Sequence, residues 1–353
     1  MARFVAVDAP DLRYKHAQMA ESFFPFFRGT FYRWAQCWAQ ACPEVADAPQ
    51  VLAVGDLHVE NFGTWRDADG RLIWGVNDFD EAYPLPYTND LVRLAVSGMI
   101  AVKSTDLVTR TRDLCEQILA GYQLAISEGG RPFVLEEEHP TLRGLAVSRL
   151  REPKAFWAKF DGRLGSRPVT QSGTPLRLLK ENWPLSAVGP LPPLHRRRGV
   201  GMGSLGKPRF VAVGQHAGGR LARELKALTP SACAWAAGTE EPVIYYGQIV
   251  ASAVRCADPF IRAQDGWLVR RLAPDCSRIE LASLELVEDE SHLLKAMGWE
   301  TANIHLNAKG NAQRILADLK KRPSGWLRDA AKRMYKLCRA DWKAWRAGDR
   351  RRA

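Results

Sequence analysis

The chain has 353 residues, which suggests about two domains or lobes, and hydrophobic residues make up 46% of it. This length and composition exclude a disordered chain and a small scaffold held together by disulfides or metals. The formal net charge is +11, from 50 Lys and Arg against 39 Asp and Glu. The segment 309–353 accounts for all of this excess, with 15 basic and 4 acidic residues. Such a segment can contact nucleic acid, anionic lipid or an acidic substrate, or it can be a solvated helix face.

The cysteine pattern indicates a cytoplasmic protein. Seven cysteines occur without a C-x-x-C pair, so the sequence predicts reduced thiols rather than a zinc site or a disulfide framework. Residues 1–10 lack the apolar core of a signal peptide, and the most apolar run, 91–102, is too short to cross a bilayer. We therefore expect no membrane span.

The first half of the chain reads as helices around two short strands. Aromatic residues crowd the segment 16–41, where Pro25 is expected to kink or break a helix. The turn Asp69-Gly70 leads into an apolar run. The expected elements are a helix at 16–41, strands at 51–54 and 71–76, and helices at 88–103 and 107–127.

The second half begins with a change in texture. Gly, Pro and Ser are frequent in 161–198, which predicts a linker. Beyond it the pattern is strand-like, and then helical from about residue 284 to the end. The expected elements are strands at 209–213 and 267–272, a hairpin turn at Gly218-Gly219 and a helix at 241–256.

Two polar motifs each follow an expected strand. They are Gly55-Asp56-Leu57-His58-Val59-Glu60-Asn61-Phe62 and Asn77-Asp78-Phe79-Asp80-Glu81-Ala82. Asp56, Asn61, Asp78 and Asp80 offer the oxygen ligands that Mg²⁺ prefers. Asp56 followed five residues later by Asn61, with Asp78 after the next strand, is the catalytic-loop arrangement of kinases. Asp56 would position the nucleophile, while Asn61, Asp78 and Asp80 would hold metal. The alternative is two polar turns in which Asp and Asn cap helices.

A glycine-rich segment, Gly201-Met202-Gly203-Ser204-Leu205-Gly206, precedes an expected strand. A strand after the glycines favours a loop that folds over ATP phosphates, with Lys226 pairing the α- and β-phosphates. A plain glycine-rich turn and a dinucleotide-binding turn remain alternatives. The composition of 221–228 favours a helix, whereas this interpretation requires a strand there.

The motifs resemble those of known families. GDLHVEN followed by NDFDEA resembles aminoglycoside phosphotransferases and other protein-kinase-like small-molecule kinases. Over roughly residues 20–305, the order of the motifs resembles the bacterial family called domain of unknown function 2252. The motifs that carry this resemblance are Phe26-Phe27-Arg28-Gly29, GDLHVEN, NDFDEA, GVGMGSLG at 199–206, Glu224-Leu225-Lys226-Ala227, Gly247-Gln248 and WLVRRL at 267–272.

The resemblance implies a circularly permuted, kinase-like α+β fold with two lobes, because the glycine-rich segment follows the catalytic loop in the chain. It implies a helical catalytic lobe at 1–165, a linker at 166–198, a β-rich nucleotide lobe at 199–283 and helices at 284–353 that return to the first lobe. It further implies that Asp90 supports the catalytic loop. The nucleotide would contact Gly201, Gly203, Ser204, Gly206, Lys226 and Gln248.

The implied function is an ATP- and Mg²⁺-dependent phosphotransferase that acts on a hydroxyl of a small molecule or a protein. The sequence departs from the usual pattern because no Glu is clearly placed to pair with Lys226. Gln248 takes that position in the family pattern, and Glu240 and Glu241 are alternatives. A nucleotide-binding pseudokinase therefore remains open, as does an AMP transferase. Nucleic-acid binding rests on the basic C-terminal segment alone, and we do not expect it.

Overall fold

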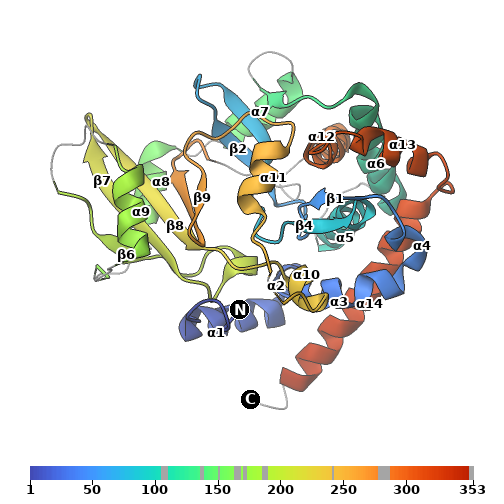
Figure 1. Ribbon diagram of the computed structural model, residues 1–353, viewed down its shortest axis with the longest axis horizontal. Coiled ribbons are helices and arrows are strands. Elements are labelled where there is room, and N and C mark those ends of the chain that lie inside the picture. The colour runs from blue at the N-terminus through green and yellow to red at the C-terminus, as the bar shows by residue number, and fades with distance from the viewer. Residues whose placement is uncertain are drawn as a thin grey trace.

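The computed structural model describes residues 1–104, 110–135, 139–149, 152–162, 168–169, 173–184, 190–240, 242–276 and 287–349. These residues form a mixed α+β structure with antiparallel sheets. A helical lobe lies on the right of Figure 1, and a lobe built on a five-stranded sheet lies on the left.

The helical lobe is assembled from both ends of the chain. Its helices are α1 (Ala9–Glu21), α2 (Phe23–Gly29), α3 (Phe31–Ala41), α4 (Pro43–Ala46), α5 (Thr88–Ser104), α6 (Thr111–Glu128), α7 (Pro140–Arg149), α12 (Val287–His305), α13 (Asn311–Leu319) and α14 (Trp326–Asp349). Two small antiparallel sheets complete the lobe. One pairs β1 (Gln50–Ala53) with β4 (Tyr83–Pro86), and the other has the order β2 (Phe62–Arg66), β3 (Leu72–Val76), β5 (Phe133–Val134).

The core of this lobe surrounds α5, whose residues are buried from Thr88 to Ala101. Helices α6 and α12 approach each other closely because glycines face the opposite backbone. A Cβ atom on Gly121 would lie 1.9 Å from Lys295 O, and one on Gly298 would lie 2.0 Å from Ile118 O. Any side chain at either glycine would push the two helices apart.

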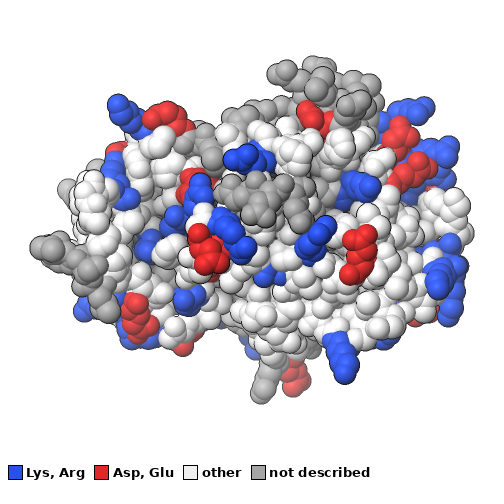
Figure 2. Space-filling view, turned by 90° about the horizontal axis from the view of Figure 1, so that it is seen from above, with Lys and Arg blue, Asp and Glu red and all other residues white. Residues whose placement is uncertain are grey.

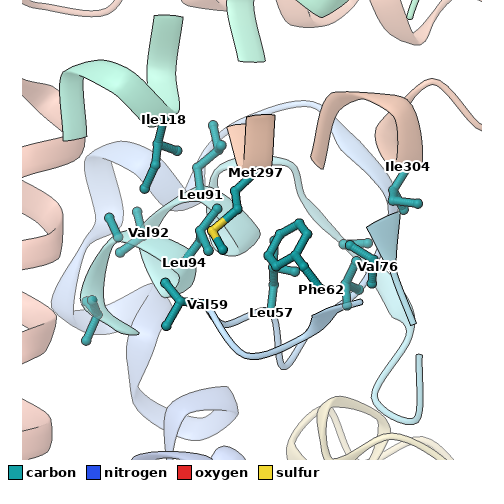
Figure 3. Close-up of a cluster of buried hydrophobic side chains, with 14 of the residues drawn as sticks. Leu57, Val59, Phe62, Val76, Leu91, Val92, Leu94, Ile118, Met297 and Ile304 are labelled. Atoms are coloured by element: carbon teal, nitrogen blue, oxygen red, sulfur yellow. The ribbon is translucent and has the colours of Figure 1, made fainter. Parts of the chain in front are cut away.

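The loop between β1 and β2 is anchored in the same core. Figure 3 shows its apolar side chains Leu57 and Val59, with Phe62 at the start of β2, among Leu94 of α5 and Met297 of α12. Burial of these apolar residues fixes the backbone that carries Asp56 and Asn61. The loop is therefore held by packing as well as by hydrogen bonds.

The second lobe is an antiparallel sheet in the order β6-β7-β8-β10-β9. Its strands are β6 (Leu194–Arg196), β7 (Arg209–His216), β8 (Gly219–Ala227), β9 (Arg262–Gln264) and β10 (Trp267–Leu272). Helix α8 (Pro153–Asp161) packs on one face and α9 (Thr174–Asn182) on the other, with α8 contributing Phe156 and Phe160 and α9 contributing Leu178 and Leu179. Ala217 and Gly218, with φ of 48° and 80°, make the tight β7–β8 turn, which confirms the expected hairpin.

The segment that carries Lys226 is a strand, so its helix-forming composition is overridden. Strand β8 pairs with β7 on one side and β10 on the other, and its residues are buried from Ala222 to Ala227. A central, two-sided strand gains cross-strand hydrogen bonds and burial that outweigh helix propensities of a few tenths of a kcal/mol per residue.

Several expected boundaries differ from the observed ones. The range 16–41 holds parts of three helices, and the first break is at the extended Ser22. Pro25 lies in the first turn of α2, where its missing N–H costs no helical hydrogen bond. The range 166–198, expected as a linker, contains α9 and β6, which belong to the sheet lobe. The helix expected at 241–256 is the shorter α11 (Tyr246–Ser252), which follows α10 (Ala232–Ala236).

The sheet lobe is inserted between the two parts of the helical lobe. The chain leaves the helical lobe after α7, contacts it again where α10 packs on α3, and returns to it at α12, which packs along α6. Helix α14 then packs along α5 and α2, as the long red helix in Figure 1 shows. Within the described residues, none of these helices is long and apolar enough to cross a membrane.

Candidate active site

A buried carboxylate fixes the backbone of the loop after β1. Asp90, in the first turn of α5, accepts hydrogen bonds from the N–H groups of Val54 at 2.7 Å and Gly55 at 3.0 Å. His305 Nε2 lies 3.1 Å from the same carboxylate. Gly55 has φ of 81°, and a Cβ atom there would lie 2.2 Å from Glu81 O. Glycine is therefore required where this loop crosses the loop after β3.

Asp56 is held by a buried arginine. Arg93 Nε donates to Asp56 Oδ1 at 2.8 Å, and its other bonds include one from Nη2 to Phe27 O at 3.1 Å. The guanidinium lies 4.0 Å from the centre of the Phe27 ring, with Phe31 and Trp34 on its other sides. Burial raises the pKa of Asp56, and the charges of Arg93 and Arg28 offset only part of this effect. Asp56 is thus an oriented carboxylate with strengthened basicity.

The free oxygen of Asp56 faces the glycine-rich segment. A Cβ atom on Gly203 would lie 3.6 Å from Asp56 Oδ2. The segment forms a short 3₁₀ turn, η1 (Met202–Ser204), within the connection between antiparallel strands β6 and β7. A dinucleotide-binding turn joins a parallel strand to a helix, so this topology rejects that alternative. The catalytic-loop motif and the glycine-rich motif therefore meet in space.

Asn61 and Asp78 are joined directly. Asn61 Nδ2 donates to the backbone O of Asp78 at 3.0 Å, so the amide oxygen of Asn61 points away from that backbone oxygen. That oxygen, Asn61 Oδ1, is buried and has no hydrogen-bond partner among the residues that the structure describes. A buried acceptor without a partner costs free energy unless a ligand or a water molecule satisfies it. Its position beside Asp78 fits an oxygen ligand for a divalent cation.

Lys226 reaches across from the sheet lobe to the same loop. Its Nζ lies 3.2 Å from Asp78 Oδ1 and 2.6 Å from Asp80 Oδ1, and the lysine is buried. Burial raises the pKa of Asp78, but the charges of Lys226 and Arg270 outweigh it, so the pKa lies far below its usual range. The structure thus brings Asp78, Asp80 and Lys226 together, as the sequence predicted. Within the described ranges, no three His, Cys, Asp or Glu side chains group as a metal site.

Gln248 and Glu240 do not take the place of the missing pairing Glu. The Gln248 side chain is on the exposed side of α11, and none of its described contacts reaches Lys226. Glu240 is exposed and lines a cavity, and Glu241 lies outside the described residues. Asp78 and Asp80 are the ion-pair partners of Lys226 in this structure.

Sequence reasoning missed the side chains that hold the site together. Glu224, two residues before Lys226 on β8, pairs with Arg270 at 2.6 Å and also with Arg197 and Arg209. Arg197 and Arg209 flank the glycine-rich segment, and Arg209 also donates to Ser204 Oγ. For Arg93 a signal was available, because a charged residue inside the apolar run 91–102 is expected to have a buried partner. For Glu224 no sequence signal distinguished it from a surface carboxylate.

Over residues 8–149 the chain matches the model of a family described as "Uncharacterized protein conserved in bacteria (DUF2252)". This range holds Asp56, Asn61, Asp78 and Asp80 but neither the glycine-rich segment nor Lys226. No curated protein and no solved structure matched the chain.

Proposed function

We propose that the protein is an ATP- and Mg²⁺-dependent phosphotransferase with a circularly permuted, kinase-like fold. The observation that carries this proposal is the convergence of Lys226, from a central strand of one lobe, on Asp78 of the other. Asn61 donates a hydrogen bond to the backbone O of the same aspartate, and its Oδ1 has no hydrogen-bond partner among the described residues. A phosphate-pairing lysine facing a metal-binding aspartate and amide is the arrangement that phosphoryl transfer requires.

Each residue has a role in the proposed reaction. The acceptor hydroxyl oxygen bonds to the γ-phosphorus of ATP while the bond from that phosphorus to the β–γ bridging oxygen breaks, which gives ADP and a phosphate ester. Asp56 Oδ2 orients the hydroxyl and receives its proton, while Arg93 holds Oδ1. Bound Mg²⁺ would neutralise charge on the phosphates, held by Asn61, Asp78 and Asp80. Lys226 would move from the carboxylates to the phosphate oxygens.

A nucleotide-binding pseudokinase is the second candidate, and the ion pairs of Lys226 favour it. In an active kinase-like site a Glu on a helix holds the lysine, whereas here two metal-binding carboxylates hold it. If Lys226 keeps these partners when nucleotide binds, Asp78 and Asp80 are not free to hold metal.

Two measurements on one sample test the proposal. Thermal unfolding is followed with ATP alone, with Mg²⁺ alone and with both, and ATP turnover is then assayed. We expect ATP and Mg²⁺ together to raise the melting temperature, since a ligand at 100 times its Kd stabilises a protein by roughly 2.7 kcal/mol. Stabilisation with turnover supports the enzyme, and stabilisation without turnover supports the pseudokinase. No response to ATP in any combination would overturn both.

A further inference from the structure

A large cavity adjoins Asp56 and the glycine-rich segment. Its volume is about 1070 Å³, enough for a small-molecule substrate. Asp56 and Gly203 contribute to its wall, and Lys226 does not. The exposed aromatic side chains of Tyr32 and Trp235, in edge-to-face contact at 6.2 Å, also line it. The cavity is therefore the space from which a molecule would reach the carboxylate of Asp56.

Three buried cations from separate elements line this cavity. They are Lys15 of α1, Arg28 of α2 and Lys207, which follows the glycine-rich segment. Lys15 is only 8% exposed, Arg28 7% and Lys207 5%. Lysine and arginine are rarely buried to this degree without a partner that offsets the charge. The partners of the three cations therefore decide what the cavity can hold.

The negative charges nearby are already engaged. Arg28 pairs with Glu60 at 3.2 Å. Asp56 is bonded to Arg93, which lies behind it. Glu81 accepts hydrogen bonds from Ser231 Oγ and the Ala232 N–H.

The two lysines lack a close anion of their own. Lys207 Nζ is 4.0 Å from Asp80 Oδ2, but Asp80 lies closer to Lys226. Lys15 has no hydrogen-bond or ion-pair partner among the described residues. Burial, together with the charge of Lys207, lowers the pKa of Lys15 to about 8, so the ammonium is still mostly charged at pH 7. The cavity wall thus carries four cations, Arg3, Lys15, Arg28 and Lys207, against three carboxylates, Asp56, Glu81 and Glu240, and neither buried lysine has a close anion to itself.

We propose that this cavity binds the acceptor, and that the acceptor is a small molecule carrying a phosphate-type dianion in addition to the hydroxyl that Asp56 orients. The inference rests on the proposed function for the hydroxyl, but the anion site stands on the cavity itself. Two lysines and an arginine around one pocket match a dianion, because each can donate charge-assisted hydrogen bonds to phosphate oxygens. A polycationic acceptor of the aminoglycoside kind would meet repulsion from the same side chains.

The test uses inorganic phosphate as the probe, without nucleotide. Binding to the full-length protein is measured by isothermal titration calorimetry and by melting temperature, against sodium chloride at equal ionic strength. Lys15→Met removes the charge and keeps an apolar stem of similar length, and Lys15→Arg keeps the charge. Lys180→Met, at an exposed position of α9 that lines neither this cavity nor another cationic groove, is the matched control for loss of one lysine. Lys226→Met reports whether phosphate binds in the nucleotide site instead.

We expect Lys15→Met to weaken phosphate binding tenfold or more, while Lys15→Arg, Lys226→Met and Lys180→Met stay within about threefold of wild type. Lys15→Met should also raise the melting temperature of the ligand-free protein by roughly 2–4 °C, because it removes a buried charge that lacks a partner. A purely structural Lys15 would lower it. If Lys15→Met does not fold, Lys207→Met is used for the same comparison.

The outcomes separate this inference from the proposed function. Phosphate binding that depends on Lys15, in a protein that does not respond to ATP and Mg²⁺, supports the anion site and contradicts the phosphotransferase. Phosphate binding that Lys226→Met abolishes and Lys15→Met leaves intact overturns the anion site, because the probe then occupies the nucleotide phosphate position. Absence of phosphate binding, or an equal response to chloride, also overturns it.

Discussion

Asp56 and Asp78 of the candidate site differ in their surroundings, and this difference supports different roles for them in the proposed reaction. Asp56 is partly buried with one arginine partner, and the pKa of its carboxyl group is raised. Asp78 lies beside Lys226 and Arg270, and the pKa of its carboxyl group is lowered. When two environments shift the pKa values of two carboxyl groups in opposite directions, the group with the raised pKa is suited to act as a base and the other to remain an anion. Asp56 is therefore suited to take a proton, and Asp78 to hold a cation.

Substitution by asparagine should separate these roles. Asp56→Asn keeps an acceptor for Arg93, so we expect nucleotide-dependent stabilisation to persist while turnover falls by roughly a hundredfold or more. Asp78→Asn removes the charge that would hold the metal, so the Mg²⁺-dependent part of the stabilisation should disappear. Thermal shift and initial rates on the same preparations measure both effects.

Equal loss of both properties in both variants would indicate a folding defect rather than distinct roles. Circular dichroism of each ligand-free variant distinguishes that case. If Asp56→Asn leaves turnover unchanged, Asp56 is not the group that orients the acceptor.

Glu300 should make stability depend on pH. It is buried on α12, accepts from the Val76 N–H at 3.1 Å and the Asn303 amide at 2.9 Å, and burial raises its pKa to about 7 despite Arg255. An acid whose pKa is higher in the folded state stabilises the fold fully below its unfolded pKa of about 4.3, and this contribution is lost as pH rises through 7. The change is on the order of 3 kcal/mol.

Urea unfolding of wild type and Glu300→Gln at pH 5 and pH 8 measures this effect. Glutamine cannot ionise, so the difference in unfolding free energy between the two proteins should shift in favour of the variant at pH 8. A difference that is the same at both pH values would show that Glu300 does not titrate in this range.

At the scale of elements, patterning predicted the strands that precede the two polar motifs and the helix that carries Asp90. The strand at 267–272 and the helix that begins at Thr88 are confirmed within one residue. The short strands β4, β5 and β9 went unpredicted because two to four residues give too little periodicity to detect. The strand β8 was contested because local propensity and the motif disagreed. Only pairing with β7 and β10, which a single sequence does not reveal, decides it.

Helix α14 should be a structural element rather than a detachable tail. An apolar stripe of α14 faces the lobe: Leu327, Ala330 and Met334 are buried, and Trp342 stacks on Phe23 of α2 at 5.3 Å. Removing residues 324–353 exposes these partners, so we expect a markedly lower melting temperature or an insoluble product. Size-exclusion chromatography and calorimetry of the truncated protein measure this.

Charge reversal on the same helix provides the comparison. Lys336→Glu changes an exposed residue and should alter stability by no more than about 0.5 kcal/mol. A truncated protein that is soluble and as stable as wild type would contradict the packing role and return attention to a binding tail.

At the scale of the whole molecule, basic side chains gather in one groove, whereas another face carries a mixture of both charges. On the face seen in Figure 2, basic side chains lie among acidic ones with uncharged surface between them. A groove of about 540 Å³ between α5 and α14 is lined by five cations: Lys103, Lys332, Lys336, Arg339 and Lys343. We do not expect nucleic-acid binding here, because the aromatic residue that lines the groove, Tyr335, is buried and does not offer a ring for base stacking.

The order of the motifs predicted that one lobe is inserted into the other. The motifs also predicted that Asp56, Asn61, Asp78 and Lys226 belong to one site. The sequence did not predict Lys15 or Arg93 as site residues. Arg93 is one charge in a buried helix, and Lys15 is one lysine in a polar helix. Their significance depends on which distant segments face them, and this is set by packing between α1, α2 and α5.

The insertion also sets the order in which a newly synthesised chain can acquire its structure. The sheet lobe, 153–276, is complete in sequence before α12 and α14 leave the ribosome. Helices α12 and α14, which pack on α6 and α5, are made last. The apolar surfaces of α5 and α6 that they cover therefore stay exposed while more than 150 residues are translated. We therefore expect the nascent chain to need chaperone protection over its first 150 residues, and ribosomes that stop before α14 to release an aggregation-prone fragment.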